Sequence, residues 1–210
     1  MLVSTTHKFI FIHVPKTAGI SMRKILEPYC DEPVTSEFRR LLSHLPISED
    51  ISKARFVGHC TANWARLKYG GKFSDYYKFA VVRNPYDWGV SYYHYKMKVG
   101  RLKYLNMEGV TYKQFIKWHQ KKLIPRVTQA KHITDRLGNI LVDDLLRFED
   151  IGHEIERLGS ILNIKLDPLP KVNVTKHKHY SEYYDDETKC LFEKLWSDDI
   201  NLLGYEFEIN

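Results

Sequence analysis

Residues 9–21 read Phe-Ile-Phe-Ile-His-Val-Pro-Lys-Thr-Ala-Gly-Ile-Ser, and they combine the patterns of a strand, a turn and the start of a helix. It begins as a continuous apolar run, which is typical of a strand covered on both faces of a sheet. A tight turn follows, and a helix is expected to begin near residues 19–22. The first amide groups of a helix have no internal partner, and the macrodipole makes that end positive. The turn therefore predicts a site where backbone N–H groups bind an anion.

The polar residues of this turn suit such a site. Gly19 lets the backbone approach a ligand closely, Lys16 adds a mobile positive charge, and Thr17 and Ser21 add hydroxyl donors. The segment differs from the nucleotide-triphosphate loop G-x-x-x-x-G-K-[ST], because the one Gly-Lys pair, at 71–72, is not followed by Ser or Thr. Taken alone, the segment could also be an ordinary strand-to-helix turn with an exposed lysine.

A second segment, 79–93, has a similar organisation and reads Phe-Ala-Val-Val-Arg-Asn-Pro-Tyr-Asp-Trp-Gly-Val-Ser-Tyr-Tyr. A buried strand ends at Arg83, and Pro85 stands where a helix can start. Ser91 then falls about two turns into that helix. An arginine at a strand end suits forked recognition of a phosphate, and a structural salt bridge is the alternative when the segment is taken alone.

The remaining patterns predict an α/β fold. Short apolar runs predict four buried strands: 8–14, 55–58, 78–82 and part of 140–148. An apolar stripe predicts a helix over 151–162, and three acidic residues at 185–187 mark the start of another. Strands that alternate with helices favour a mainly parallel sheet, whose ligands bind at the carboxyl ends of the strands. Because no repeat or linker interrupts the pattern, we expect a single domain over 1–210.

The composition excludes several classes of protein. The chain has 210 residues, of which 43% are hydrophobic and 28% charged, and its net charge is +6, so it is globular and not basic enough to imply nucleic acid. Neither a transmembrane run nor a secretory leader is visible, so we expect a cytoplasmic protein, although a trimmed lumenal domain would look the same. Three separated cysteines argue against a disulfide scaffold or a zinc ribbon.

Together the two segments resemble the PAPS-dependent sulfotransferases, which use 3′-phosphoadenosine 5′-phosphosulfate, and most closely the group that acts on carbohydrates. Segment 15–21 is similar to the family's 5′-phosphosulfate loop, and segment 82–93 to its 3′-phosphate element. Similar segments follow in familiar order: 143–149, 169–173, 183–187 and 203–205. One departure is Trp88, where the family often carries a second arginine. The resemblance implies a three-layer fold like that of P-loop NTPases, with a central, mainly parallel β-sheet flanked by helices.

The resemblance also implies an activity and a set of site residues. The chain is expected to transfer the sulfuryl group from PAPS to an acceptor hydroxyl, on a saccharide or polysaccharide, by in-line displacement and without a metal. The residues implied to bind the nucleotide are Lys16, Thr17, Ala18, Gly19, Ile20, Ser21, Arg83, Ser91, Asn173, Thr175 and Lys176. Lys16 has a catalytic role as well, because its charge stabilises the departing phosphate oxygen.

A histidine is expected to act as the general base. His59 follows Phe-Val-Gly at the end of an expected strand and is similar to the catalytic base of the uronyl 2-O-sulfotransferases. His13 is the second candidate, and Glu149 is a carboxylate alternative for which we favour a structural role. Aromatic residues on the expected helices, Tyr92, Tyr93, Tyr95 and Trp118, suit either a sugar groove or, more commonly, a core.

Two other functions are consistent with parts of the sequence. A P-loop-like nucleotide-dependent kinase would use the same kind of strand and turn, but the chain lacks the Walker sequence that such enzymes carry. A non-enzymatic basic module would bind polyanions such as nucleic acid or acidic polysaccharide through its dispersed lysines and arginines, with strongly salt-dependent affinity.

Overall fold

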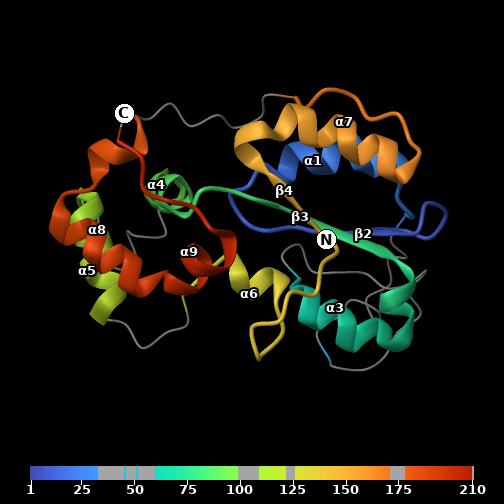
Figure 1. The fold of residues 1–210 in the computed structure, drawn as a ribbon, viewed down its shortest axis with the longest axis horizontal. Helices are drawn as coiled ribbons and strands as arrows, with labels where there is room; N and C mark the ends of the chain where they lie inside the picture. The colour runs from blue at the N-terminus through green and yellow to red at the C-terminus, as the bar shows by residue number, and fades with distance from the viewer. Residues whose placement is uncertain are drawn as a thin grey trace. The chain divides into compact units, whose positions relative to one another are not determined.

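The structure is a computed structural model that describes residues 1–32, 45, 51, 60–98, 109–121, 126–170 and 178–209 (Figure 1). The chain forms two compact units, which we describe separately. The sheet unit comprises Met1–Val82 and Gln129–Val172, and the helical unit comprises Arg83–Thr128 and Asn173–Asn210. The single domain expected over 1–210 stays a prediction.

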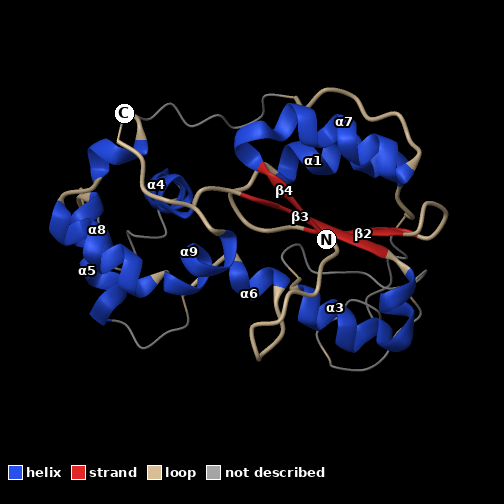
Figure 2. Cartoon of the chain, viewed as in Figure 1, coloured by secondary structure: helices blue, strands red, loops and turns tan. Residues whose placement is uncertain are grey.

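The sheet unit contains one sheet, and in the described part of the chain its strands follow the order β1-β2-β3-β4 (Figure 2). Their bounds are Leu2–Ser4, Phe9–Ile12, Tyr77–Val82 and Asp144–Arg147. β1 is antiparallel to β2, whereas β2, β3 and β4 run parallel. The expected α/β fold with a mainly parallel sheet flanked by helices is therefore confirmed.

Two strand predictions differ from the structure in detail. The run 140–148 contributes only β4, and β1 was not predicted, because three edge residues give too short a pattern. The expected strand 55–58 lies outside the described residues.

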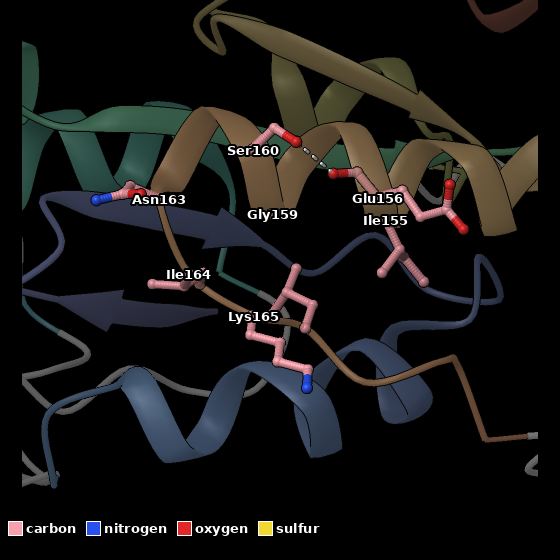
Figure 3. Close-up of a pocket in the computed structure, with 8 residues that line it drawn as sticks. Ile155, Glu156, Gly159, Ser160, Asn163, Ile164 and Lys165 are labelled. Atoms are coloured by element: carbon pink, nitrogen blue, oxygen red, sulfur yellow. Dashed lines mark hydrogen bonds between the residues drawn. The ribbon is translucent and has the colours of Figure 1, made fainter.

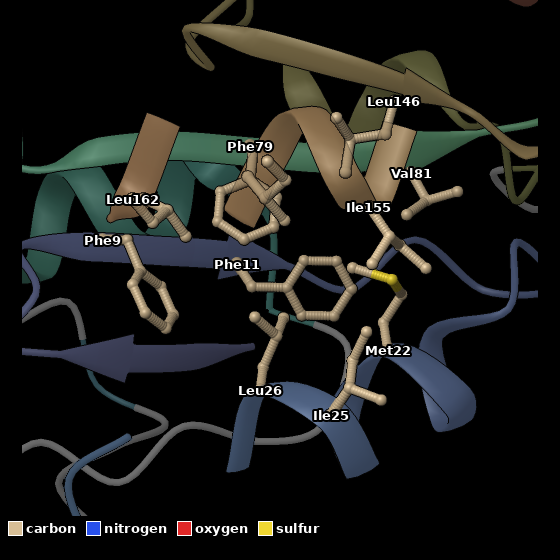
Figure 4. Packing of buried hydrophobic residues seen from close by; sticks show 11 residues of the cluster. Phe9, Phe11, Met22, Ile25, Leu26, Phe79, Val81, Leu146, Ile155 and Leu162 are labelled. Atoms are coloured by element: carbon tan, nitrogen blue, oxygen red, sulfur yellow. The ribbon is translucent and has the colours of Figure 1, made fainter. Parts of the chain in front are cut away.

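Helices cover the sheet on both faces (Figure 1). α1 (Gly19–Leu26) and α7 (Ile151–Leu162) lie on one face, and α3 (Ala62–Tyr69) lies on the other. The face under α1 and α7 carries aromatic side chains of alternating strand residues, such as Phe9 and Phe11 (Figure 4). Because β2 is buried along its whole length, its apolar run meets hydrophobic cover on both sides. α1 and α7 begin where the sequence predicts.

Shorter helices complete the sheet unit: η1 (Glu27–Tyr29), η2 (Gly70–Asp75), α6 (Ala130–Ile133) and η4 (Phe148–Asp150). The helical unit comprises α4 (Pro85–Lys98), α5 (Tyr112–Lys121), η5 (Tyr180–Tyr183), α8 (Asp186–Leu195) and α9 (Ser197–Leu203). As the acidic residues at 185–187 predict, α8 starts there, and the Asp185 side chain accepts a hydrogen bond from the Thr188 amide at 2.8 Å. Within the ranges given above, no helix is both long enough and apolar enough to cross a membrane.

The core of the helical unit is aromatic. Trp88 is fully buried and stacks on Tyr92 with ring centroids 5.0 Å apart and an interplanar angle of 9°. Trp196 stacks in the same way on Phe192 at 4.7 Å. Trp88 thus has a packing role at the position where the resemblance leads us to expect a second arginine. A charged side chain would be buried in an apolar core there.

Most of the aromatic side chains considered for a sugar groove belong to this core. Tyr92 is buried within it, and Tyr93 and Trp118 pack against it. Tyr95, with 39% of its surface exposed, remains accessible to solvent. The geometry favours the core interpretation for the first three residues.

His119 on α5 is buried in this aromatic core. Neither ring nitrogen has a hydrogen-bond partner among the described residues, and the rings of Phe115, Trp118 and Trp196 surround it at centroid distances of 4.7, 4.8 and 5.4 Å. Burial, together with the smaller effect of the positive charges of Arg126 and Lys96, lowers the pKa of His119 to about 4. The folded protein therefore holds this imidazole in its neutral form.

This burial predicts a loss of stability in mild acid. The unfolded chain protonates His119 below a pH of about 6.5, whereas the folded chain does so only near the lowered pKa. The free energy of unfolding should therefore fall by roughly 3 kcal/mol as the pH drops from about 6.5 to 4. Chemical denaturation at several pH values measures this free energy. His119→Phe should flatten its dependence on pH, and replacement of the exposed His153 should not. An unchanged slope in His119→Phe would show that His119 does not cause the loss of stability.

Candidate active site

The turn between β2 and α1 has an unusual backbone. Lys16 and Ala18 have positive φ angles of 68° and 61°, whereas Thr17 and Gly19 on either side of Ala18 do not. A left-handed conformation costs a non-glycine residue roughly 1–2 kcal/mol, so this turn is strained twice within three residues. Left-handed residues that alternate with residues of negative φ can direct successive N–H groups into one concavity, which suits an anion. The backbone of the turn is therefore compatible with the anion site that the sequence predicts.

The amino end of α1 supports this interpretation electrostatically. No side chain caps this end by a hydrogen bond, and its first turn contains no acidic residue. The basic residues Arg23 and Lys24 lie in its last turn. In α8, by contrast, Asp185 caps the amino end and acidic residues fill the first turn. Within α1 itself, the positive end of the dipole therefore has no carboxylate beside it, an arrangement that suits an anion.

The side chains of the turn divide between support and ligand binding. Thr17 is fully buried and its hydroxyl donates to the Val14 carbonyl oxygen at 3.0 Å, so it closes the turn. Ser21 is also buried, whereas Lys16 is partly accessible. Ile20 stands out from the first turn of α1 with 52% of its surface exposed. The sequence alone does not show that the Thr17 hydroxyl is structural, because Thr17 and Ser21 both carry hydroxyl groups that could bind a ligand.

Gly19 is required by packing against His13. A Cβ added at Gly19 would lie 1.9 Å from the Cδ2 and Nε2 atoms of His13. The His13 ring in turn lies parallel to Phe11, with centroids 6.1 Å apart and an interplanar angle of 17°. The imidazole therefore rests directly on the first residue of α1. The sequence predicts only that Gly19 lets a ligand approach the backbone; the contact with His13 depends on how the strand end meets the helix, which the sequence pattern does not show.

The second predicted segment starts within β3, and its part from Arg83 onward begins the helical unit, directly after the last residue of β3. Asn84 starts α4: its carbonyl oxygen accepts from the Trp88 amide at 2.8 Å, and its Oδ1 accepts from the Tyr86 amide at 3.0 Å. Nε of Arg83 donates to Oδ2 of Asp87 at 2.7 Å. Ser91, four residues after Asp87, shares its helix face and is buried. The predicted helix start at Pro85 is confirmed.

Four other predicted site residues lie outside the described residues: His59, Asn173, Thr175 and Lys176. Glu149 is exposed in η4, beyond the end of β4, so it is not part of the buried strand that the sequence suggested. Among the residues that the structure describes, no three His, Cys, Asp or Glu side chains form a group able to hold a metal ion.

An open pocket on α7 is separate from the turn (Figure 3). It is lined by Glu156, Ser160, Lys165 and neighbouring residues of the second half of α7 and the segment after it. This half of the helix reaches Leu162, which lies over Phe9 at the amino end of β2, whereas the turn follows its carboxyl end (Figure 4). The residues that line the pocket all lie between 155 and 166, so it is formed by α7 and the segment after it.

The fold is that of an α/β protein with a mainly parallel sheet, in which a parallel strand leads through a tight turn into a helix. The model of the sulfotransferase family matches residues 1–206, and the chain belongs to this family, whose members are PAPS-dependent transferases. No curated protein matches the chain.

Among solved structures, the chain is similar to the crystal structure of a sulfotransferase from Alicyclobacillus acidocaldarius. The two are 15% identical, the match covers 95% of this chain and 96% of that one, and the TM-score is 0.49.

The contact between Gly19 and His13 predicts a coupled pair of variants. Gly19→Ala should destabilise the protein by about 2 kcal/mol, because the new methyl group overlaps the imidazole. His13→Ala should cost less in the Gly19→Ala background than in the wild type, since the methyl group then occupies vacated space. Denaturant unfolding of the four proteins measures the coupling; additive effects would show that the two residues do not interact.

Ala18→Gly is the matched control, because it removes a methyl group from the neighbouring loop residue, whereas Gly19→Ala adds one. Removal of the Cβ relieves the positive φ at this position and should raise stability by about 1 kcal/mol.

Proposed function

We propose that this protein transfers the sulfuryl group of PAPS to a hydroxyl group of a saccharide or polysaccharide. The observation that carries the proposal is the backbone of residues 16–19, where alternating φ signs precede an uncapped helix end. Family membership implies PAPS as the donor, and the two predicted segments, in order along the chain, support one binding element for each end of it.

The 5′-phosphosulfate group suits the turn before α1. It is strongly anionic, so the concave backbone and the α1 dipole both favour it. Lys16 adds a full positive charge from a partly accessible position in the same turn. We assign Lys16, Ala18, Gly19, Ile20 and Ser21 to this end of the nucleotide, and Thr17 contributes by its backbone.

Arg83 and Ser91 are assigned to the 3′-phosphate. Guanidinium groups bind phosphate through paired N–H donors, and a serine hydroxyl adds one more. The strands that lead to the two segments are parallel neighbours, with Ile12 of β2 opposite Ala80 of β3. Both strands therefore run toward the same edge of the sheet, from which the two segments continue along the chain. Asn173, Thr175 and Lys176 complete the proposed nucleotide contacts.

The proposed reaction is an in-line displacement at sulfur. A bond forms between the acceptor oxygen and sulfur while the bond from sulfur to the 5′-phosphate oxygen breaks. The negative charge that develops on the leaving phosphate is stabilised by Lys16 and the amides of the turn. His59 accepts the proton of the acceptor hydroxyl, as the similar Gly-His of uronyl 2-O-sulfotransferases suggests.

The role of Lys16 predicts loss of turnover. Lys16→Ala should lower kcat with PAPS by roughly 10²–10³-fold, because it removes charge that acts on the leaving group. Lys24→Ala, at the other end of the same helix, is the matched control and should retain activity. Release of adenosine 3′,5′-bisphosphate, followed by mass spectrometry with a panel of saccharide acceptors, measures turnover.

Nucleotide preference separates this function from the two alternatives. Adenosine 3′,5′-bisphosphate should raise the melting temperature more than ATP does, and Arg83→Ala should weaken its binding about tenfold or more. Tighter binding of ATP would favour a kinase. No effect of either nucleotide, with salt-sensitive binding of long polyanions, would favour a non-enzymatic module.

The general base is tested separately. His59→Ala should lower kcat by roughly 10²–10⁴-fold and leave the affinity for adenosine 3′,5′-bisphosphate unchanged, since a general base acts on the acceptor. His153→Ala, at an exposed position on α7, serves as the control. Full turnover by His59→Ala would remove this assignment without changing the enzyme class.

A further inference from the structure

Asp87 holds the guanidinium group of Arg83 by one edge. Oδ2 of Asp87 accepts from Nε of Arg83 at 2.7 Å and lies 2.6 Å from Nη2. The Arg83 and Asp87 side chains are only 12% and 20% exposed, so the pair is shielded from water. Two nitrogens that meet one carboxylate oxygen fix both the position and the plane of the guanidinium group. Such a contact is stronger than the exposed ion pairs of the same spacing elsewhere in the chain, such as Arg23–Glu27.

The first turn of α4, which carries Asp87, is fixed by hydrogen bonds and by packing. The hydrogen bonds run from the Tyr86 and Trp88 amides to Asn84. Trp88, the next residue along, is fully buried, and Glu193 of α8 accepts a hydrogen bond from the Tyr86 hydroxyl at 2.8 Å. The carboxylate of Asp87 therefore has little freedom to move. Its place next to Arg83 is set by the packing of the helical unit.

A carboxylate at this position is unfavourable for direct binding of phosphate. Like charges repel, and the repulsion is stronger where water is excluded. Asp87 can therefore favour phosphate binding only through Arg83, by removing the entropy that a mobile arginine side chain loses when it binds a ligand. Asp87 therefore has two opposite effects on the affinity for phosphate. It orients the arginine, which raises the affinity, and it repels the anion, which lowers it. An experiment can decide between them, because they change affinity in opposite directions.

We propose that Asp87 is a positioning residue that orients Arg83 toward the 3′-phosphate and thereby sets the preference for nucleotides that carry this phosphate. The inference rests on the proposed function, in which Arg83 binds that group. Because AMP lacks the 3′-phosphate but keeps the 5′-phosphate, the gain from orientation is confined to adenosine 3′,5′-bisphosphate. The ratio of the two affinities therefore reports on Asp87, whereas a general loss of folding would change both affinities together.

The test is calorimetric titration of both nucleotides into the full-length protein and its variants. Asp87→Ala should lower the preference for adenosine 3′,5′-bisphosphate over AMP by about three- to tenfold, with little change for AMP. Asp87→Asn keeps an acceptor oxygen and should retain most of the preference. Arg83→Ala should abolish it, and Glu27→Ala, which removes the exposed pair on α1, should leave it unchanged. Asp87→Ser provides a second truncation should the alanine variant not fold.

The outcomes separate this inference from the proposed function. A wild-type protein without preference for the 3′-phosphate would overturn both. A preference that Arg83→Ala removes and Asp87→Ala retains would overturn the role of Asp87 and leave the function standing. Tighter binding of adenosine 3′,5′-bisphosphate by Asp87→Ala would show that repulsion dominates, and would also overturn the positioning role.

Discussion

Parallel pairing of β2 with β3 positions both the core of the sheet unit and the two segments that leave the sheet. The pairing sets Phe9 opposite Tyr77 and Phe11 opposite Phe79, and it places buried aromatic rings under α1 and α7. Because the two strands run in the same direction, the chain leaves both at one edge of the sheet. The turn that carries Lys16 follows the first strand, and the segment of Arg83 follows the second. A slip in this register would displace both segments and the core beneath them.

The turn before α1 combines strain with packing. Positive φ angles at Lys16 and Ala18 are unfavourable for residues with a Cβ, so the surroundings must stabilise the conformation. The buried hydroxyl of Thr17 closes the turn on Val14, and the ring of His13 rests on Gly19. These two contacts hold the strained backbone of the turn in one conformation. Electrostatic stabilisation is most effective when the dipoles need not reorganise during the reaction.

The sequence carried enough information for the main elements of the fold. Continuous apolar runs predicted β2 and β3, since strands buried on both faces lack alternation, and the stripe over 151–162 predicted α7. The edge strand β1 was not predicted, because three residues are too few to show the alternation of apolar and polar residues that marks a strand. At the site, residue types predicted an anion-binding turn and a helix start at Pro85. They did not predict the contact of His13 with Gly19 or the pairing of Asp87 with Arg83, which depend on side-chain placement in three dimensions.

The helical unit is assembled from two stretches of chain that are far apart in the sequence. Its core needs Trp88 and Phe115 from the first stretch, and Phe192 and Trp196 from the second, residues 173–210. During synthesis from the amino end, α4 and α5 are made well before their aromatic partners in α8. The nascent chain must therefore carry uncovered aromatic surface until α8 has been synthesised. Exposed apolar surface of this kind favours aggregation during that interval.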